Sequence, residues 1–288
     1  MAKRIYAQGG LGNQLFIWRA AHHLLAITNE PIQVVYPKSF SGHRALELEP
    51  LLRHCSHQIS IQEPRELNLR VKLTQRYPQL NFKLMRIAPA NLRVQVSADP
   101  NFGIKTLDPK GSDFLGFFQN ATSEDSENSS VYQETNNVIK ENWQRVSQIP
   151  SLDKKDEFQV LHVRRGDYEL LKNNYGLLNY QYYKRNLIPD LETIICTDSE
   201  NLSAEFLSHF ENCLVLSTED LDTWQTLSLM VNSKYFIGAN STLSWWAARL
   251  RVENGAKSVL PHPWFKKGNQ ENKFLFPEIS FAESEFEQ

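Results

Sequence analysis

Phe158-Gln159-Val160-Leu161-His162-Val163 is a short, mostly apolar run, and Arg164-Arg165-Gly166-Asp167-Tyr168 follows it without a spacer. Such a run is typical of a strand buried on both faces of a parallel sheet. Four more strand candidates follow it, at 193–197, 213–216, 235–238 and 258–260. Helical patterns lie between the strands, at 180–188, 202–210, 222–231 and 243–251. This alternation predicts an α/β fold with a parallel sheet covered by helices on both faces.

The length of 288 residues suits two domains of about 130 to 150 residues each. Pro150 and the charged run 153–157 come just before the first strong strand, so we place the boundary there and expect domains at 1–150 and 151–288. The N-terminal half begins with a strand candidate at 3–7, a glycine-rich turn, and a helical pattern at 15–27. The pattern between 37 and 150 is too weak to predict a topology.

The composition is that of a folded protein, with 41% hydrophobic and 22% charged residues and a formal net charge of -2. This charge gives no global basic field, so we expect no nucleic-acid partner and a local Arg or Lys cluster for any anionic ligand. Cys55, Cys196 and Cys213 lack metal-ligand spacing and are expected to be free core thiols. No apolar run approaches the roughly 20 residues of a membrane span, so we expect a cytoplasmic protein.

Ligands bind at the carboxyl ends of the strands in sheets of this kind, so the residues just after each strand are the candidates for function. Arg164 and Arg165 follow the first strand of this half, and two guanidiniums can clamp a diphosphate through charge-assisted hydrogen bonds. Gly166 permits a backbone turn, and Asp167 can orient an Arg or accept a proton. The alternative is an ordinary surface ion pair between Arg and Asp.

Two further strand ends carry polar groups. Asp198 could accept protons from a base such as guanine, or its neighbours could simply cap the next helix. Asn240, Ser241 and Thr242 precede another helix, where hydroxyls and unpaired backbone amides form a ready anion site. N-capping explains Ser241 equally well.

The N-terminal glycine turn contains Gly10, Gly12 and Asn13, but its spacing differs from a dinucleotide fingerprint, so NAD binding is disfavoured. The turn could instead offer amide groups to a ligand. Trp245 and Trp246 point about 100° apart if they are helical, so one or both are expected to pack in the core.

Three segments together resemble the α-1,2-fucosyltransferases of glycosyltransferase family 11, in its soluble bacterial form. They are Gly-Gly-Leu-Gly-Asn-Gln-Leu-Phe at 9–16, His-Val-Arg-Arg-Gly-Asp-Tyr at 162–168, and Asn-Ser-Thr-Leu-Ser-Trp-Trp-Ala-Ala at 240–248. The family commonly has Phe where this chain has Leu243. The segments occur in the family's order, and the resemblance covers most of the chain except about 37–150.

The resemblance implies a two-lobed GT-B fold, with an acceptor-side N-terminal lobe and a Rossmann-like C-terminal lobe that binds GDP-β-L-fucose. It implies inverting transfer of fucose to the 2-hydroxyl of a β-galactoside without a metal ion. No Asp-x-Asp pair stands where a metal-bound diphosphate would require one, which agrees with this mechanism. By the resemblance, Arg164 clamps the diphosphate, and Arg165 either assists it or holds Asp167. His162 and Asp198 hold the guanosine, and Ser241 and Thr242 hold the phosphates. Asp167 is the candidate base.

We therefore expect no cofactor, since GDP-fucose is a substrate. The expected acceptor is a galactose-terminated oligosaccharide or a lipid-linked glycan, reached through peripheral contact with the inner membrane face. Two alternatives remain: a glycan-binding protein without turnover, and a transferase of the same fold with another linkage or donor.

Overall fold

The computed structural model describes residues 2–37, 45–55, 58–65, 69–76, 94–96, 107–119, 129–152, 157–199, 202–267 and 278–287. The chain divides into two compact units, Met1–Thr135 and Asn136–Gln288. The division lies inside helix α4 (Ser129–Val146), whereas the sequence suggested a boundary after this helix.

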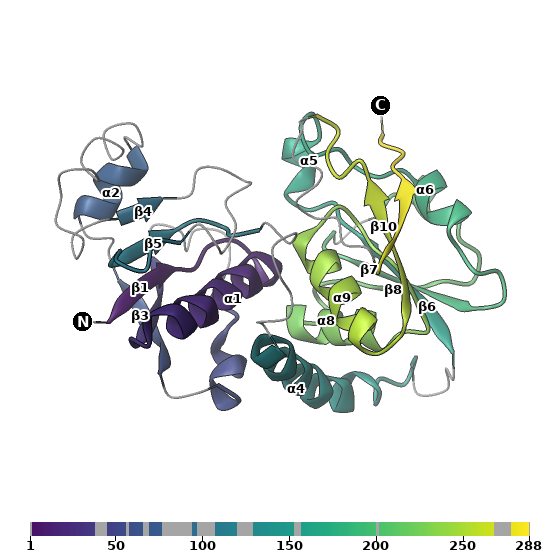
Figure 1. Cartoon of the computed structure of the whole chain (residues 1–288). Helices are drawn as coiled ribbons and strands as arrows, with labels where there is room; N and C mark the ends of the chain where they lie inside the picture. Colours follow the sequence, from purple (N-terminus) through teal and green to yellow (C-terminus); the bar gives the residue numbers. More distant parts are fainter. Residues whose placement is uncertain are drawn as a thin grey trace. The chain divides into compact units, whose positions relative to one another are not determined.

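The first unit is built on a five-stranded sheet in the order β3-β2-β1-β5-β4, in which all paired strands are parallel. The strands are β1 (Lys3–Tyr6), β2 (Ile32–Pro37), β3 (Ile59–Arg65), β4 (Val94–Val96) and β5 (Asp113–Leu115). The other elements among the described residues of this unit are α1 (Leu11–Thr28), η2 (Glu49–Arg53), α2 (Leu69–Arg76) and the first part of α4. Helix α1 lies against β1 and β2 and is buried along much of its length (Figure 1).

Helix α1 begins earlier than the sequence pattern suggested. Gly10 is its N-cap in extended conformation, so Gly12 and Asn13 lie in the first helical turn and not in a loop. Gly9 precedes them at φ 74, and a Cβ there would stand 2.4 Å from the Asn13 side-chain nitrogen. The glycine pair thus turns the chain tightly from β1 into α1.

The second unit contains a six-stranded parallel sheet in the order β11-β10-β9-β6-β7-β8. Its strands are β6 (Phe158–Val163), β7 (Glu192–Thr197), β8 (Leu214–Leu216), β9 (Tyr235–Ile237), β10 (Lys257–His262) and β11 (Ser280–Glu283). The five strands expected from the sequence are all present. The sequence analysis missed β11, an edge strand of four residues without an apolar run, none of which is buried. Counted along this unit, the order is that of the doubly wound nucleotide-binding fold, with a reversal between β6 and β9. The expected α/β fold with parallel sheets is confirmed.

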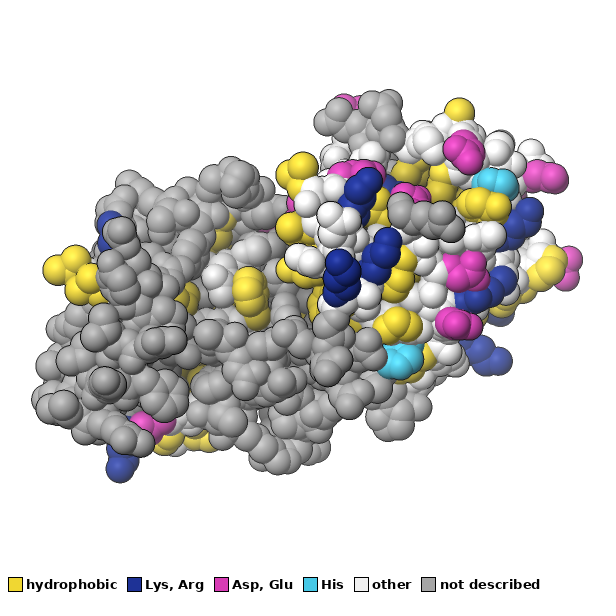
Figure 2. Space-filling model, turned by 90° about the horizontal axis from the view of Figure 1, so that it is seen from above, with side chains coloured by type: hydrophobic (Ala, Val, Ile, Leu, Met, Phe, Trp, Pro, Cys, Tyr) yellow, Lys and Arg dark blue, Asp and Glu magenta, His cyan; other side chains and the backbone are white. Residues whose placement is uncertain are grey.

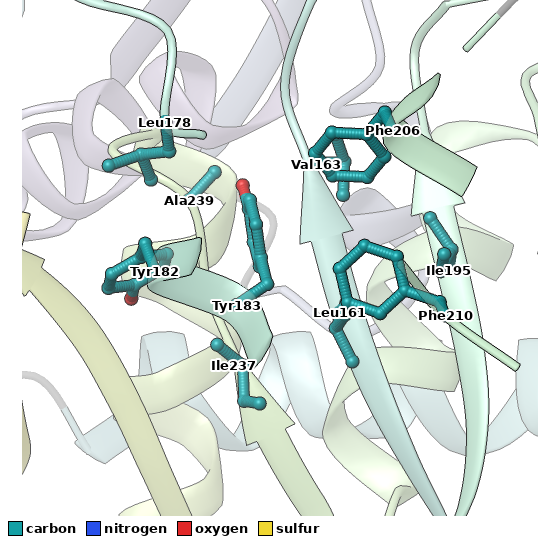
Figure 3. Packing of buried hydrophobic residues seen from close by; sticks show 10 residues of the cluster. All are labelled: Leu161, Val163, Leu178, Tyr182, Tyr183, Ile195, Phe206, Phe210, Ile237 and Ala239. Atoms are coloured by element: carbon teal, nitrogen blue, oxygen red, sulfur yellow. The ribbon is translucent and has the colours of Figure 1, made fainter. Parts of the chain in front are cut away.

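The helices of this unit are α5 (Tyr168–Leu171), α6 (Tyr180–Arg185), α7 (Ala204–Leu207), α8 (Thr223–Asn232) and α9 (Thr242–Glu253). Helices α8 and α9 pack side by side (Figure 1). Successive side chains of β6 point to opposite faces, so Leu161 and Val163 join the cluster with α6 and α7 while His162 faces α9. Figure 3 shows this cluster around β6.

Trp245 and Trp246 are both fully buried in α9, as expected. Among the described residues, no helix combines the length and the apolarity that crossing a membrane requires. On the face of the second unit seen in Figure 2, basic and acidic side chains are interspersed.

Candidate active site

The chain reversal between β6 and β9 brings two of the sequence-predicted segments to the same edge of one sheet. The two strands are direct neighbours, and their register pairs Leu161 with Ile237. Residues 164–168 follow β6, and residues 238–242 follow β9. In doubly wound sheets this position is where ligands bind, because the loops of the two adjacent strands diverge there and leave a crevice.

Arg164 is held by two carboxylates and an aromatic ring. Its guanidinium nitrogens lie 2.6 Å from Asp198 Oδ2 and 2.5 Å from Asp167 Oδ1, and its Cζ lies 5.3 Å from the centre of the Tyr168 ring. The contact with Asp198 is close but poorly aligned for a hydrogen bond. Among the described residues, buried Arg164 Nε has no hydrogen-bond acceptor. Arg164 is thus a positioned cation with a remaining donor.

Asp198 also shapes the turn after β6. Its Oδ1 accepts a hydrogen bond from the backbone N–H of Arg165 at 2.7 Å. A Cβ on Gly166 would stand only 2.2 Å from Asp198 Oδ2, so a glycine is required where the turn meets this carboxylate. In this structure Asp198 therefore orients the arginine loop, a role that the sequence alone did not suggest.

Arg165 points in a different direction from Arg164. It is buried, its Nη2 donates to the Leu178 carbonyl at 3.3 Å, and its Nη1 lies 2.5 Å from Glu287. Its Cζ also lies 5.1 Å from the centre of the Phe206 ring. The sequence left two roles open for Arg165, to assist Arg164 or to hold Asp167. In this structure Arg165 has neither role: Asp167 pairs with Arg164, and Arg165 ties β6 to the C-terminal segment.

His162 is bonded to Ser244, a residue that the sequence did not single out. Ser244 Oγ lies 2.6 Å from His162 Nδ1 and accepts the backbone N–H of Ala239 at 2.9 Å. Because Ser244 Oγ already accepts the Ala239 N–H, the geometry favours donation of its hydroxyl proton to His162 Nδ1, and this arrangement places the His162 proton on Nε2. Burial, together with the nearby charge of Arg164, lowers the pKa of His162 to about 3. His162 is therefore a neutral imidazole that presents an Nε2–H donor.

Two tyrosines of α6 hold the ends of both strands. Tyr183 donates to the His162 carbonyl at 3.0 Å, and Tyr182 donates to the Gly238 carbonyl at 2.9 Å. Both rings belong to the cluster drawn in Figure 3. Burial raises the pKa of each phenol, so both remain donors at neutral pH.

Asn240 is buried and uses its side chain within the protein. Its side-chain Nδ2 donates to the backbone carbonyls of Tyr175 and Gly176 at 3.0 and 3.3 Å. The backbone carbonyl of Asn240 accepts from the Tyr168 hydroxyl at 2.9 Å. Asn240 thus joins the loop after β9 to the segment after β6.

Ser241 is the N-cap of α9, and its Oγ accepts from the Leu243 N–H at 3.3 Å. Thr242 is the first residue of the helix. The N-terminus of α9 therefore lies at the sheet edge that carries Arg164, where its partial positive charge adds to that of the guanidinium.

The chain's Asp-x-Asp triplet, Asp220-Leu221-Asp222, lies after β8. Asp222 Oδ1 caps α8 by accepting the Gln225 N–H at 2.8 Å, and Asp220 Oδ2 accepts the Ser217 N–H at 2.8 Å. Both carboxylates thus have local structural roles.

The glycine-turn residues belong to the first unit. Asn13 Oδ1 accepts from Gln119 Nε2 at 2.8 Å. Gln14 bonds to the Gly9 and Ala45 carbonyls and accepts from the Glu47 N–H, so it stabilises its own loop. Gly10 and Gly12 have no side chain to offer, and their contribution to a ligand would come from backbone amides.

Comparison with known proteins gives relatives of one reaction class. The chain is 25% identical over 287 residues to an alpha-1,2-colitosyltransferase of Escherichia coli, across 90% of this chain and 91% of the relative. It is 30% identical over 123 residues to the O-antigen biosynthesis glycosyltransferase WbnK of Escherichia coli, across 39% of this chain and 40% of that protein. No family model matches the chain. These relatives support the predicted class, that of a glycosyltransferase.

Among solved structures, the Escherichia coli ADP-heptose LPS heptosyltransferase II matches with a TM-score of 0.51 and 13% identity. The match covers 97% of this chain and 90% of that protein. The shared fold is of the GT-B type, in agreement with the two parallel sheets.

Proposed function

We propose that the chain transfers L-fucose from GDP-β-L-fucose to the 2-hydroxyl of a β-galactoside, with inversion and without a metal ion. The observation that carries the proposal is the placement of Arg164 and the α9 N-terminus after neighbouring strands, at the reversal point of a nucleotide-binding sheet. Both are suited to bind a diphosphate and to stabilise the charge that develops on it as it leaves.

Arg164 is the residue proposed to meet the diphosphate. Asp198 and Asp167 hold its guanidinium in place, so little side-chain freedom would be lost on binding. Its Nε–H lacks a hydrogen-bond acceptor among the described residues, and a phosphate oxygen would supply one after a small movement. His162 would offer its Nε2–H to the guanosine, while Ser241 and Thr242 would bind phosphate oxygens together with the amides of α9. Asn240 would support this loop.

The reaction is a single displacement. The acceptor oxygen bonds to the anomeric carbon of fucose, the bond from that carbon to the phosphate oxygen breaks, and its electron pair leaves with GDP. The acceptor proton goes to a base, for which Asp167 is proposed because it is 54% exposed beside Arg164. Gly10, Gly12 and Asn13 of the first unit are proposed to add backbone or amide contacts to the donor, and that unit is proposed to bind the acceptor.

A second donor is favoured by one finding, the 25% identity to a colitosyltransferase. Colitose differs from L-fucose by the absence of the 3-hydroxyl. A site that hydrogen-bonds this hydroxyl rejects the deoxy sugar by about 10⁴-fold, whereas a pocket without such a partner accepts both. The two GDP-sugars are therefore to be compared at equal concentration.

The test is incubation of the purified protein with GDP-fucose, lactose and EDTA, followed by NMR analysis of the product linkage. A 2-linked fucosyl product supports donor, linkage and metal independence together. Strict dependence on an added metal would refute the metal-independent mechanism. The absence of GDP binding would refute the assignment of GDP-fucose as the donor.

The matched variants are Arg164→Ala and Arg185→Ala. Arg185 pairs with Glu285 at the surface, so its loss removes a similar ion pair away from the proposed site. We expect Arg164→Ala to reduce kcat/KM by about 100-fold or more and Arg185→Ala to leave it nearly unchanged. Equal rates for a folded Arg164→Ala protein and the wild type would refute the clamp.

A further inference from the structure

The first unit contains a cluster of three side chains of metal-ligand type that the proposed transferase chemistry does not use. His22 comes from α1, Cys55 from the loop after η2, and Glu134 from α4. Their ligand atoms all lie within 4.8 Å of one another. These segments are far apart in sequence, so the cluster has no spacing motif that could be recognised. The sequence therefore suggested only a free thiol at Cys55.

We propose that His22, Cys55 and Glu134 bind a zinc ion. A nitrogen, a thiolate and a carboxylate oxygen form a ligand set that suits Zn²⁺ and disfavours Mg²⁺ or Ca²⁺, which prefer oxygen alone. Tetrahedral zinc with bonds of about 2.0 to 2.3 Å places its ligand atoms roughly 3.3 to 3.8 Å apart. His22 Nε2 and Glu134 Oε2 are 3.0 Å apart, so small side-chain movements suffice to admit the ion.

The surroundings orient two of the ligands, as the outer contacts of metal sites do. Trp18 is fully buried, and its Nε1–H donates to Glu134 Oε2 at 2.8 Å. Ser130 Oγ lies 3.3 Å from His22 Nδ1, which leaves Nε2 directed at Glu134 and available to a metal. Glu134 is buried, while His22 and Cys55 are half-buried, so the cluster is reachable from solvent.

The competing explanation is a metal-free network in which His22 and Trp18 both hydrogen-bond to Glu134. In that case Cys55 is not needed to hold an ion. Cys55 therefore distinguishes the two explanations, and Cys213 is the matched control because it is also a half-buried, reduced thiol and lies outside the cluster.

The experiment uses tag-free protein kept reduced with a phosphine. Wild type, Cys55→Ser and Cys213→Ser are incubated with zinc sulfate and desalted, and their metal content is measured by mass spectrometry. We expect about one zinc ion per chain to be retained by the wild type and by Cys213→Ser, and about tenfold less or lower by Cys55→Ser. Circular dichroism verifies that each variant is folded.

Cobalt provides a second readout that does not depend on variants. Co²⁺ bound to the wild type is expected to give a sulfur-to-cobalt charge-transfer absorption, which shows thiolate ligation directly. A folded wild-type protein that retains no zinc overturns the proposal, and so does equal retention by Cys55→Ser. The proposal does not depend on the transferase activity, and EDTA assays of Cys55→Ser separate this site from any metal needed in turnover.

Discussion

Replacing Ser244 by Ala tests whether the orientation of His162 matters for function. The substitution removes the 2.6 Å contact to His162 Nδ1 and leaves the Ala239 N–H without the acceptor that it has at 2.9 Å. It creates little space, and it changes none of the groups proposed to touch the donor. Ser244→Ala thus removes the group that the geometry favours for directing the His162 proton to Nε2.

Two effects are expected. A buried N–H that loses its acceptor destabilises the fold by about 1 to 3 kcal/mol. If His162 meets the donor through Nε2–H, the wrong tautomer also weakens that contact by about 1 to 2 kcal/mol, which lowers kcat/KM roughly 5- to 30-fold. Ser228→Ala is the control, because Ser228 is equally buried and its Oγ donates to the Ile139 carbonyl at 2.9 Å.

The assays are urea unfolding, steady-state kinetics, and nitrogen-15 NMR of the histidine side chains. The NMR signals of His162 report its tautomer directly, and a purely structural role of Ser244 would not change them. The reasoning fails if His162 carries its proton on Nδ1 in the wild type, or if Ser244→Ala and Ser228→Ala have the same kcat/KM.

Three further outcomes are expected. Arg251→Met should lower the free energy of unfolding in urea by about 3 kcal/mol or more, because the buried guanidinium donates to five carbonyls. The control is Lys234→Ala, which removes a surface ion pair and should change the free energy of unfolding by less than about 1 kcal/mol. Gly166→Ala should lower turnover as strongly as Arg164→Ala while the protein stays folded, because the new Cβ displaces Asp198, and wild-type rates would contradict the turn geometry. His162 has a folded pKa of about 3, below its ordinary value of 6.5, so its contribution to stability is present above pH 6.5 and is lost as pH falls toward 3. The wild type should therefore lose up to about 1.4 kcal/mol per pH unit more than His162→Gln in this range, and parallel curves would refute the burial of a neutral His162.

The hydrophobic pattern predicted the second unit well because β6, β7, β9 and β10 are buried along most of their length. β6 has six buried residues in succession, and runs of this kind separated by helical patterns permit little except a parallel sheet. The first unit was harder to predict. Its short strands β4 and β5 have three residues each, and α4 lies in the segment 37–150, whose pattern was too weak to predict a topology.

The sequence by itself determined which residues follow each strand, and so which polar groups stand at one edge of the second sheet. That inference needs only the direction of parallel strands. The sequence could not determine the direction of the side chains. Arg164 and Arg165 are adjacent, yet Arg164 faces two aspartates at the sheet edge and Arg165 enters the core toward Leu178. The contact of Ser244 with His162, and the proximity of Cys55 to Glu134, join segments that only tertiary packing brings together. Local periodicity therefore specifies the strands and helices. The hydrogen-bond partner of each side chain, and the nitrogen that carries the His162 proton, depend on distances between segments that are far apart in the chain.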